Sequence, residues 1–586
     1  MNNRKLSVIF VATMLCAGAI VIGGSISPFD PGEDQSDTTL GSGDIDLLNA
    51  VRFGGSAADQ FESVTATSDG GFVAVGLSVG FDSGDWAGVT GWGNNDAIIV
   101  KFDSNGTVVW KTRFGGSGAD MFSSVTTTLD GGFVAVGYSV AASFGNGDWG
   151  GVTGRGGTDA IIVKFDSNGT VVWKNLFGGS AADQFNSVTT TSDGGFVAVG
   201  YSVAASFGNG DWVGVTGWEN NNAIIVKFDS AGNVVWKNRF GGNGAHDYFH
   251  SVTTSDSGFV AVGYSNAASF GTGDWAGVTG RGNNDAIIVK FDSSGEVVWK
   301  NRFGGSVADR FNSVTSTSDG GFVAVGYSAS ASFGNGDWVG VTGRGGNDAI
   351  IVKFDSAGNV VWKTRFGGSG ADQFNSVTST SDGGFMAVGD SGGFGNGDWV
   401  GVTGRGGNDA IIVKFDSAGN ALGRNLFGGS VNDTFNGVVV TSNDIFVAVG
   451  YSQPASFGNG DWAGVTGRGG NDAIIVYFST VSEPQISIFS TPSLSIVTGN
   501  IWSYTPQTDP SGTTISVTGA SWLSSNGTTI SGTAPAPLDG ISQTYDLTIS
   551  ASKAGFETAT QSVSLTVYAS LTFVSIPTQS INVTGG

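Results

Sequence analysis

The sequence predicts an all-β protein, a seven-bladed β-propeller followed by a small β-sandwich. Three observations support this fold class. A unit of about 63 residues recurs along the chain, as from Phe114 to Phe177. Each unit contains four strand-like runs bounded by Gly, Asn, Asp and Ser. The last unit ends after its third strand, while a single unmatched strand precedes the first unit.

The composition agrees with a folded all-β chain and excludes several classes of function. Among 586 residues there are 99 glycines and 10 prolines, and only 13% of residues are charged. The net charge of −23 repels phosphate backbones, so we expect no nucleic-acid partner. With Cys16 as the sole cysteine and His246 and His250 as the two histidines, we expect neither a disulfide framework nor a zinc site.

Residues 1–25 have the pattern of an export signal peptide or an N-terminal membrane anchor. Arg4 and Lys5 precede an apolar run, and Ala17, Gly18 and Ala19 provide small residues for cleavage. We therefore expect an extracellular or cell-surface location, with membrane contact only through this segment if it is not cleaved. Cys16 suggests lipidation, but Leu15 before it is bulkier than the small residue expected before a lipidated cysteine. Residues 26–43 are polar and are expected to form a flexible linker.

Three markers count the repeated units of residues 44–480. Each marker occurs seven times. The Phe-Gly-Gly marker begins at Phe53, Phe114, Phe177, Phe240, Phe303, Phe366 and Phe427. The apolar AIIV run begins at Ala97, Ala160, Ala223, Ala286, Ala349, Ala410 and Ala473. The Asp-Trp marker places tryptophan at Trp86, Trp149, Trp212, Trp275, Trp338, Trp399 and Trp462.

The second unit illustrates the four predicted strands, over residues 122–128, 132–139, 159–165 and 170–177. Asp130-Gly131 joins the first pair as a hairpin. Ser167-Asn168-Gly169 joins the second pair, where Asn and Gly accept a positive φ at little cost. Four antiparallel strands in each of several repeats are typical of propeller blades, and a linear solenoid is the competing architecture.

The split unit favours a closed ring over the solenoid. Residues 44–53 match the fourth strand of a unit, and residues 472–479 are the third strand of the last one. Pairing these two segments completes one blade from both ends of the domain. It also protects a sheet edge that an open array exposes.

The repeated string, SDGGFVAVGYS followed by DAIIVKFDSNGTVVWK and FGGS, resembles the SBBP-type, seven-bladed propeller repeats of microbial surface and secreted proteins. The resemblance covers residues 44–480 and implies an architecture, because members of that group mostly carry no assigned chemistry. The run DSNGTVVW at residues 166–173 also resembles the repeat motif of quinoprotein propellers. The same residues serve as a turn and a packed aromatic in any blade.

Residues 481–568 are predicted to form the sandwich, because the composition changes to Ser, Thr and Pro and short alternating runs follow. These runs are residues 513–517, 528–532, 545–550 and 560–567. The region resembles the immunoglobulin-like or cadherin-like modules of microbial surface proteins. Residues 569–586 parallel its beginning, so we interpret them as the incomplete start of a second module.

The candidate ligand-binding surface is the face that carries the long loop between the second and third strands of each unit, here called the loop face. Its candidate residues are the Asp-Trp pairs Asp85, Trp86, Asp148, Trp149, Asp211, Trp212, Asp274, Trp275, Asp337, Trp338, Asp398, Trp399, Asp461 and Trp462. If these tryptophans are exposed, they suit a lectin-like role; otherwise they pack the blades.

Asn146 and Asp148 offer oxygen ligands at the alternate spacing that calcium loops use. The alternative is that Asn and Asp bond to neighbouring backbone amides in Asx-type turns. No other cofactor is expected.

Two further sets of residues are weighed against packing roles. Trp110, Trp173, Trp236, Trp299 and Trp362 could bind sugars, but regularly placed tryptophans on an outer strand favour packing between blades. Residues 244–250 (GAHDYFH) break the repeat with an additional residue and both histidines. An acid or base for catalysis would be sought there first, at His246 and Asp247.

These features favour a non-enzymatic exported protein of the prokaryotic envelope. Its propeller head would stand on an immunoglobulin-like stalk and bind a cell-surface protein or glycan in adhesion. A secreted polysaccharide hydrolase or lyase that uses the loop face is the first alternative. A structural spacer without a specific ligand is the second.

Overall fold

The computed structural model describes residues 45–244, 246–441, 444–480, 487–509, 511–553 and 559–570. The predicted signal or anchor (1–25), the predicted linker (26–43) and residues 571–586 of the predicted second module lie outside the described residues. Within the described part, no helix is long and apolar enough to cross a membrane.

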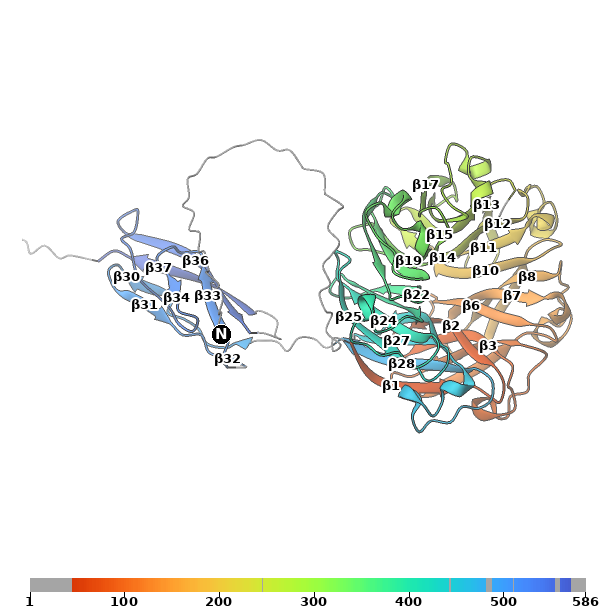
Figure 1. The fold of residues 1–586 in the computed structure, drawn as a ribbon, viewed down its shortest axis with the longest axis horizontal. Helices are drawn as coiled ribbons and strands as arrows, with labels where there is room; N and C mark the ends of the chain where they lie inside the picture. Colours follow the sequence, from red (N-terminus) through yellow and green to blue (C-terminus); the bar gives the residue numbers. More distant parts are fainter. Residues whose placement is uncertain are drawn as a thin grey trace, which may run out of the picture.

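The described residues 45–480 form seven four-stranded antiparallel sheets, arranged around a centre in Figure 1. Six sheets each use four consecutive strands. The first three sheets are β2 (Asp59–Ala66), β3 (Phe72–Ser78), β4 (Asp96–Phe102) and β5 (Val108–Phe114); β6 (Asp120–Thr127), β7 (Phe133–Val140), β8 (Thr158–Phe165) and β9 (Val171–Phe177); and β10 (Asp183–Thr190), β11 (Phe196–Val203), β12 (Asn221–Phe228) and β13 (Val234–Phe240). The next three are β14 (Asp247–Ser255), β15 (Gly258–Asn266), β16 (Asn284–Asp292) and β17 (Val297–Phe303); β18 (Asp309–Ser316), β19 (Phe322–Ala329), β20 (Asn347–Phe354) and β21 (Val360–Phe366); and β22 (Asp372–Ser379), β23 (Phe385–Ser391), β24 (Asp409–Phe415) and β25 (Ala421–Phe427). The remaining sheet has the order β1 (Ile45–Phe53), β28 (Asp472–Thr480), β27 (Ile445–Ser452), β26 (Asp433–Val440). The all-β fold of repeated four-stranded blades is thereby confirmed.

The turns within each sheet use the residues that the sequence singles out. Gly131 has φ 80° and Gly169 has φ 80°, in the left-handed region that favours glycine. Asn168 does not adopt positive φ, contrary to the expectation for this turn. Instead the Asp166 carboxylate accepts hydrogen bonds from the amides of Asn168 and Thr170, at 2.9 and 2.8 Å, and this Asx turn fixes the hairpin.

The hydrophobic core lies between neighbouring sheets. Val134 and Ile162 of one sheet pack with Ala198 and Ile224 of the next in a single buried cluster. The second and third strands of each blade are apolar on both faces because neighbouring sheets cover both faces, and all seven residues of β4 are buried. The strands with the sequences AIIV and FVAV therefore show no alternation of polar and apolar residues.

The ends of the domain meet in one sheet. β1 pairs antiparallel with β28, with Phe53 opposite Ala473 and Ile45 opposite Thr480. The last and first sheets also share a buried cluster, in which Val449 and Ile475 pack with Ala74 and Ile98. The split unit thus pairs as its sequence predicts, and the innermost strand β26 contacts β2. The array closes on itself, and the solenoid alternative is wrong.

The long loops contain short 3-10 turns that the sequence analysis did not anticipate. They are η1 (Gly84–Trp86), η2 (Ala141–Ser143), η3 (Gly147–Trp149), η4 (Ala204–Ser206), η5 (Gly210–Trp212), η6 (Ala267–Ser269), η7 (Gly273–Trp275), η8 (Ser330–Ser332), η9 (Gly336–Trp338), η10 (Gly397–Trp399), η11 (Pro454–Ser456) and η12 (Gly460–Trp462). Each Gly-Asp-Trp motif is one such turn.

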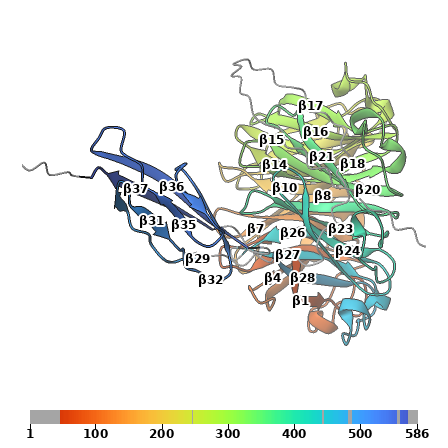
Figure 2. The ribbon, with the colours of Figure 1, turned by 60° about the vertical axis from the view of Figure 1, so that its left-hand side comes forward.

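The C-terminal region is a small β-sandwich with its own core, seen beside the ring in Figure 2. One sheet has the order β30 (Ser495–Val497), β37 (Ala559–Tyr568), β36 (Ser542–Ser552), β33 (Thr514–Thr518), and another has β31 (Ile501–Tyr504), β35 (Ile530–Thr533), β34 (Ser524–Ser525). β29 (Ser487–Ile488) pairs with β32 (Thr508–Asp509). Trp502, Ile530 and Leu565 are buried in the core between the sheets.

Candidate functional site

The Gly-Asp-Trp turn of each loop docks onto the Phe-Gly-Gly link that enters the same blade. In the second unit the Asp148 amide donates to the Gly115 carbonyl at 2.8 Å, and the Gly115 amide donates to the Asp148 carboxylate at 3.0 Å. Gly147 has φ 53°, and a Cβ there would lie 2.4 Å from the Gly115 oxygen. This close approach explains why glycine precedes the aspartate in every copy.

The loop tryptophans are buried, so the lectin-like alternative, which needs them exposed, is wrong and the packing alternative is confirmed. All seven have an exposed fraction of 0–1%. Trp149 packs edge-to-face on Phe114, with ring centroids 5.0 Å apart, and its Nε1 donates to Ser139 Oγ at 2.9 Å. The 3-10 turn points the indole inward, where its large apolar surface is removed from water. The tryptophans therefore pack the blades.

The seven loop aspartates each form an ion pair with an arginine of the preceding unit, and we call these contacts the inter-blade pairs. Arg113 lies 3.2 Å from Asp148, and Arg239 lies 2.7 Å from Asp274. The other pairs are Arg155 with Asp211, Arg281 with Asp337, Arg344 with Asp398, Arg405 with Asp461 and Arg468 with Asp85. Because each carboxylate also accepts from a link glycine, these aspartates couple one blade to the next.

The paired arginine lies either on the outer strand or in the long loop of the preceding unit, and the sequence shows which position is used. Where the loop carries Trp92 or Trp218, the paired arginine lies on the preceding outer strand, as Arg113 or Arg239. The guanidinium then stacks 4.3 Å from the tryptophan ring in both units. Where the loop carries Arg155 instead, Leu176 occupies the strand position. The fifth-unit aspartate Asp337 pairs with arginines at both positions, Arg281 and Arg302. The repeats thus preserve at least one positive charge facing each loop aspartate, a signal that the sequence analysis missed.

A second set of aspartates is buried at the starts of the first strands. In the first unit, Asp59 is 0% exposed, and its carboxylate accepts from the Gly55 amide at 2.8 Å. The set comprises Asp59, Asp120, Asp183, Asp247, Asp309, Asp372 and Asp433. Six further buried aspartates are the first or second residues of third strands: Asp96, Asp159, Asp285, Asp348, Asp409 and Asp472. Burial raises the pKa of Asp59, Asp96, Asp247, Asp309, Asp372 and Asp409 to about 6.

The side-chain oxygens of Asn146 and Asp148 bond to the link and to the preceding unit, and not to neighbouring amides as the Asx-turn alternative predicts. Asn146 Oδ1 accepts from the Ser117 amide at 2.6 Å, and its Nδ2 donates to the Ala142 carbonyl at 3.0 Å. The Asp148 carboxylate accepts from Arg113, the Gly115 amide and Trp92 Nε1. Within the described residues, no group of three or more His, Cys, Asp or Glu side chains could hold a metal ion. Calcium binding at this loop stays an untested alternative.

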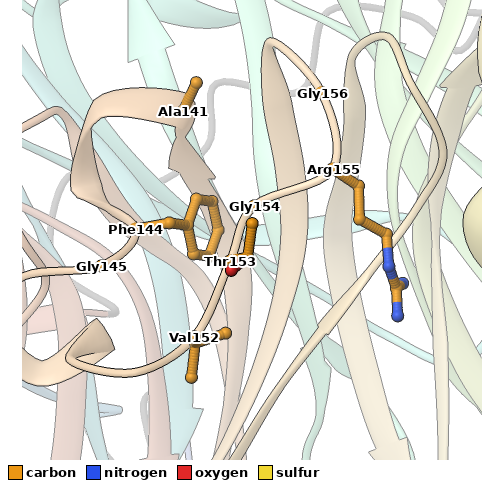
Figure 3. Close-up of a pocket in the computed structure, with 8 residues that line it drawn as sticks. All are labelled: Ala141, Phe144, Gly145, Val152, Thr153, Gly154, Arg155 and Gly156. Atoms are coloured by element: carbon orange, nitrogen blue, oxygen red, sulfur yellow. The ribbon is translucent and has the colours of Figure 1, made fainter.

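A shallow pocket of about 340 Å³ lies within the long loop of the second unit, lined by Ala141, Phe144, Gly145, Val152, Thr153, Gly154, Arg155 and Gly156 (Figure 3). The Phe144 ring lies against Gly154, where a Cβ would be 2.5 Å from the ring. The pocket is thus formed by a loop that folds onto its own phenylalanine. Its charged group, Arg155, is already paired with Asp211.

The outer-strand tryptophans connect neighbouring blades, as the packing alternative predicts. Trp110 Nε1 donates to the carbonyl of Ser167, in a turn of the next blade, at 3.0 Å, and its ring lies 5.9 Å from Phe133 of that blade. Trp173, Trp236, Trp299 and Trp362 make the corresponding hydrogen bonds to Ser230, Ser293, Ser356 and Ser417.

The irregular fourth unit does not assemble an acid and base pair at His246 and Asp247. Asp247 is buried and accepts from the Gly242 amide at 3.1 Å and Ser269 Oγ at 2.8 Å, the same contacts that Asp309 makes in a regular unit. His246 is exposed, and its ring centroid lies 6.2 Å from that of Tyr248. Asp247 therefore has a structural role.

These sheets and their shared cores define the protein as a β-propeller that carries a β-sandwich. No protein-family model matches the chain. The regulatory protein FlaEY of Caulobacter vibrioides is 27% identical over 208 residues, which are 34% of this chain and 21% of that protein. The chain thus matches about a fifth of the length of this relative.

Among solved structures, the WD40 β-propeller domain of Doa1 aligns with a TM-score of 0.38 and 11% identity, over 74% of this chain and 97% of that one. YCF48 bound to D1 peptide aligns with a TM-score of 0.35 and 11% identity, over 76% and 100% of the two chains. Both likenesses are too distant to carry functional information.

Proposed function

We propose that this protein is an exported, non-enzymatic binding protein of the cell surface. Its seven-bladed propeller head presents the loop face to a surface protein or glycan, and the immunoglobulin-like module serves as a stalk. The observation that carries the proposal is the repetition of the inter-blade pairs. Because the loop aspartates bind arginine and backbone amides in every unit, they support a rigid scaffold rather than one reactive centre.

The contacts of the candidate catalytic residues favour binding over hydrolysis. An acid or base must have an atom free to reach the substrate. Asp247 lacks access because it is buried among its own link and loop. The exposed His246 has no carboxylate hydrogen bond among the described residues that would orient it for catalysis.

The export part of the proposal rests on the sequence of residues 1–25 and on the acidic composition. A net charge of −23 favours solubility outside the cell. Fractionation of the producing cells, combined with protease treatment of intact cells, tests this directly. We expect the full chain in the envelope or medium and accessible to protease. Recovery in the cytosol alone would contradict export.

The binding part is tested with the full chain on an array of envelope glycans and in pull-down with envelope proteins. We expect at least one saturable interaction without turnover of the bound glycan. Release of sugar fragments by the wild type, abolished by His246→Ala, would instead establish the hydrolase alternative. If neither the array nor the pull-down detects an interaction, the result would contradict the proposal and favour the structural spacer alternative.

A further inference from the structure

The units differ from one another most clearly where their innermost strands begin. The residue after the buried aspartate of each first strand is Gln60, Met121, Gln184, Tyr248, Arg310, Gln373 or Thr434. Figure 1 shows β2, β6, β10, β14 and β22 around the centre of the ring. Since a ligand that binds at the centre meets each unit once, this position can break the sevenfold repetition without disturbing the blades.

Arg310 stands in an aromatic cluster formed by two neighbouring blades. Its guanidinium carbon lies 4.3 Å from the centroid of Tyr264 and 5.7 Å from that of Tyr327. Behind Tyr264, the rings of Tyr248 and His250 follow at 5.0 and 5.6 Å. All five side chains are half-buried. We call this group the Arg310 cluster.

Arg310 has no anionic partner among the described residues. Its Nε is buried without a hydrogen bond, and no ion pair of Arg310 with a carboxylate is present in that part of the chain. Eight other arginines, by contrast, pair with aspartates: Arg113, Arg155, Arg239, Arg281, Arg302, Arg344, Arg405 and Arg468. A partly desolvated guanidinium is costly unless an anion or acceptor compensates it.

The neighbouring groups favour an anion and not a cation. His250 Nε2 is buried and unpartnered, and burial together with Arg310 lowers the pKa of His250 to about 3, so the ring is neutral near pH 7. The nearest acidic group along the strand, Asp309, directs its carboxylate to the Gly305 amide at 2.9 Å and to Ser332 Oγ at 2.8 Å. Nothing in these contacts neutralises Arg310.

The cluster lies at the loop-face end of the innermost strands. Arg310 is the second residue of β18, directly after the Phe-Gly-Gly link, and Tyr264 and Tyr327 lie at the ends of β15 and β19 that lead into the long loops. Arg310, Tyr264 and Tyr327 therefore lie together near the end of the inner strands from which the long loops leave.

We propose that the Arg310 cluster binds the carboxylate of an acidic sugar, with the hexuronate residue of a glycan as the ligand class. The planar guanidinium pairs with a carboxylate through two parallel hydrogen bonds. The surrounding tyrosine hydroxyls suit a hydroxyl-rich ligand better than an apolar peptide. This inference rests on the proposed glycan-binding role and specifies its site and its ligand chemistry.

Calorimetric titration of the full chain with D-glucuronate and with D-glucose tests the inference. We expect glucuronate to bind at least about tenfold more tightly than glucose. Arg310→Gln should remove this difference, and Arg310→Lys should restore only part of it because lysine lacks the planar fork. Gln occupies the corresponding position in three other units, so Arg310→Gln is expected to fold, which its melting temperature verifies.

Met121→Gln is the matched control, because it makes the same kind of change at the equivalent position of β6, away from the Arg310 cluster. It should leave glucuronate binding unchanged. Equal binding of glucuronate by the wild type and Arg310→Gln would overturn the inference. So would preferential binding of an aspartate-rich peptide or of inorganic phosphate with no response to glucuronate.

The two proposals fail in distinguishable ways. If the protein binds neutral glycans or envelope proteins but not glucuronate, the Arg310 inference is wrong while the binding function stands. If it binds none of these ligands, both proposals are contradicted.

Discussion

Arg468 of the last unit forms an ion pair with Asp85 of the first, across 383 residues of sequence. The same guanidinium donates to the Gly54 carbonyl at 2.6 Å. This inter-blade pair uses a loop arginine, as do the pairs of Arg155, Arg281, Arg344 and Arg405, although it joins the two ends of the domain. The electrostatic coupling between blades is therefore continuous around the ring.

Removing the closing pair should destabilise the whole propeller. In Arg468→Gln, Asp85 keeps its glycine contact but loses its cation, and we expect a loss of about 1 kcal/mol because the pair is only partly buried. Thermal unfolding of the full chain measures the effect. Asp82→Asn, in the same loop but exposed and outside the pair, is the control and should leave Tm unchanged. An equal effect of both variants would contradict the role of the pair.

The exchange of arginine positions predicts a rescue. Arg113→Leu should lower the stability by about 1 kcal/mol, because Asp148 loses its ion pair. Adding Trp92→Arg recreates the arrangement of Arg155 and Leu176 and should recover most of the loss. A double-mutant cycle on Tm quantifies the coupling. Additive losses in the double variant would show that the two positions do not exchange one function.

β1 is expected to be required for a closed ring. A chain that begins at residue 54 leaves β28 with an unpaired edge, which favours aggregation. A chain that begins at residue 44 retains β1 and is the matched control. Size-exclusion chromatography should find the control monomeric or in one defined state and the shorter chain aggregated. An equally well-behaved shorter chain would show that closure does not depend on β1.

The buried aspartates predict that mild acid stabilises the protein. Their folded pKa of about 6 lies above the ordinary aspartate value of 3.8, so the folded state binds more protons between these two values. The free energy of unfolding should therefore fall as the pH rises from about 4 to 6 and remain level above that range. Melting curves at pH 5 and pH 7.5 test this, and a higher Tm at pH 7.5 would contradict it.

Below pH 4 the opposite trend should take over. Lys101 and Lys164 pair with Asp69 and Asp130, and these contacts lower the pKa of both carboxyls to about 2. Stability from a lowered pKa is present above the unfolded value and is lost as the pH falls through the folded one. The expected profile thus has its maximum between these two ranges.

Chelation tests the calcium prediction at Asn146 and Asp148. Because arginine and backbone amides already occupy these oxygens, we expect EDTA and added Ca²⁺ to leave Tm unchanged. Asp148→Asn should lower Tm equally in both conditions. A rise of Tm with Ca²⁺ that Asp148→Asn abolishes would establish a calcium site at the loop.

Much of the architecture can be predicted from the sequence because the patterns that specify it are local and repeated. The Asp130-Gly131 turn, the apolar run at Ala160 and the split unit predict the hairpins, the covered strands and the pairing of β1 with β28. The predicted sandwich strands also lie within one to three residues of β33, β35, β36 and β37. The shorter strands β29, β30, β31, β32 and β34, of two to four residues, were not predicted.

The chemical environment of each side chain was decided by tertiary structure. A tryptophan in a glycine-rich loop gives no sign of whether it faces solvent, and only the docking of the loop onto the Phe-Gly-Gly link buries Trp149. Likewise, the partner of Asp148 lies on another blade. Repetition specifies what each blade is, whereas packing between blades determines which charges are satisfied at Asp148 and which remain unpaired at Arg310.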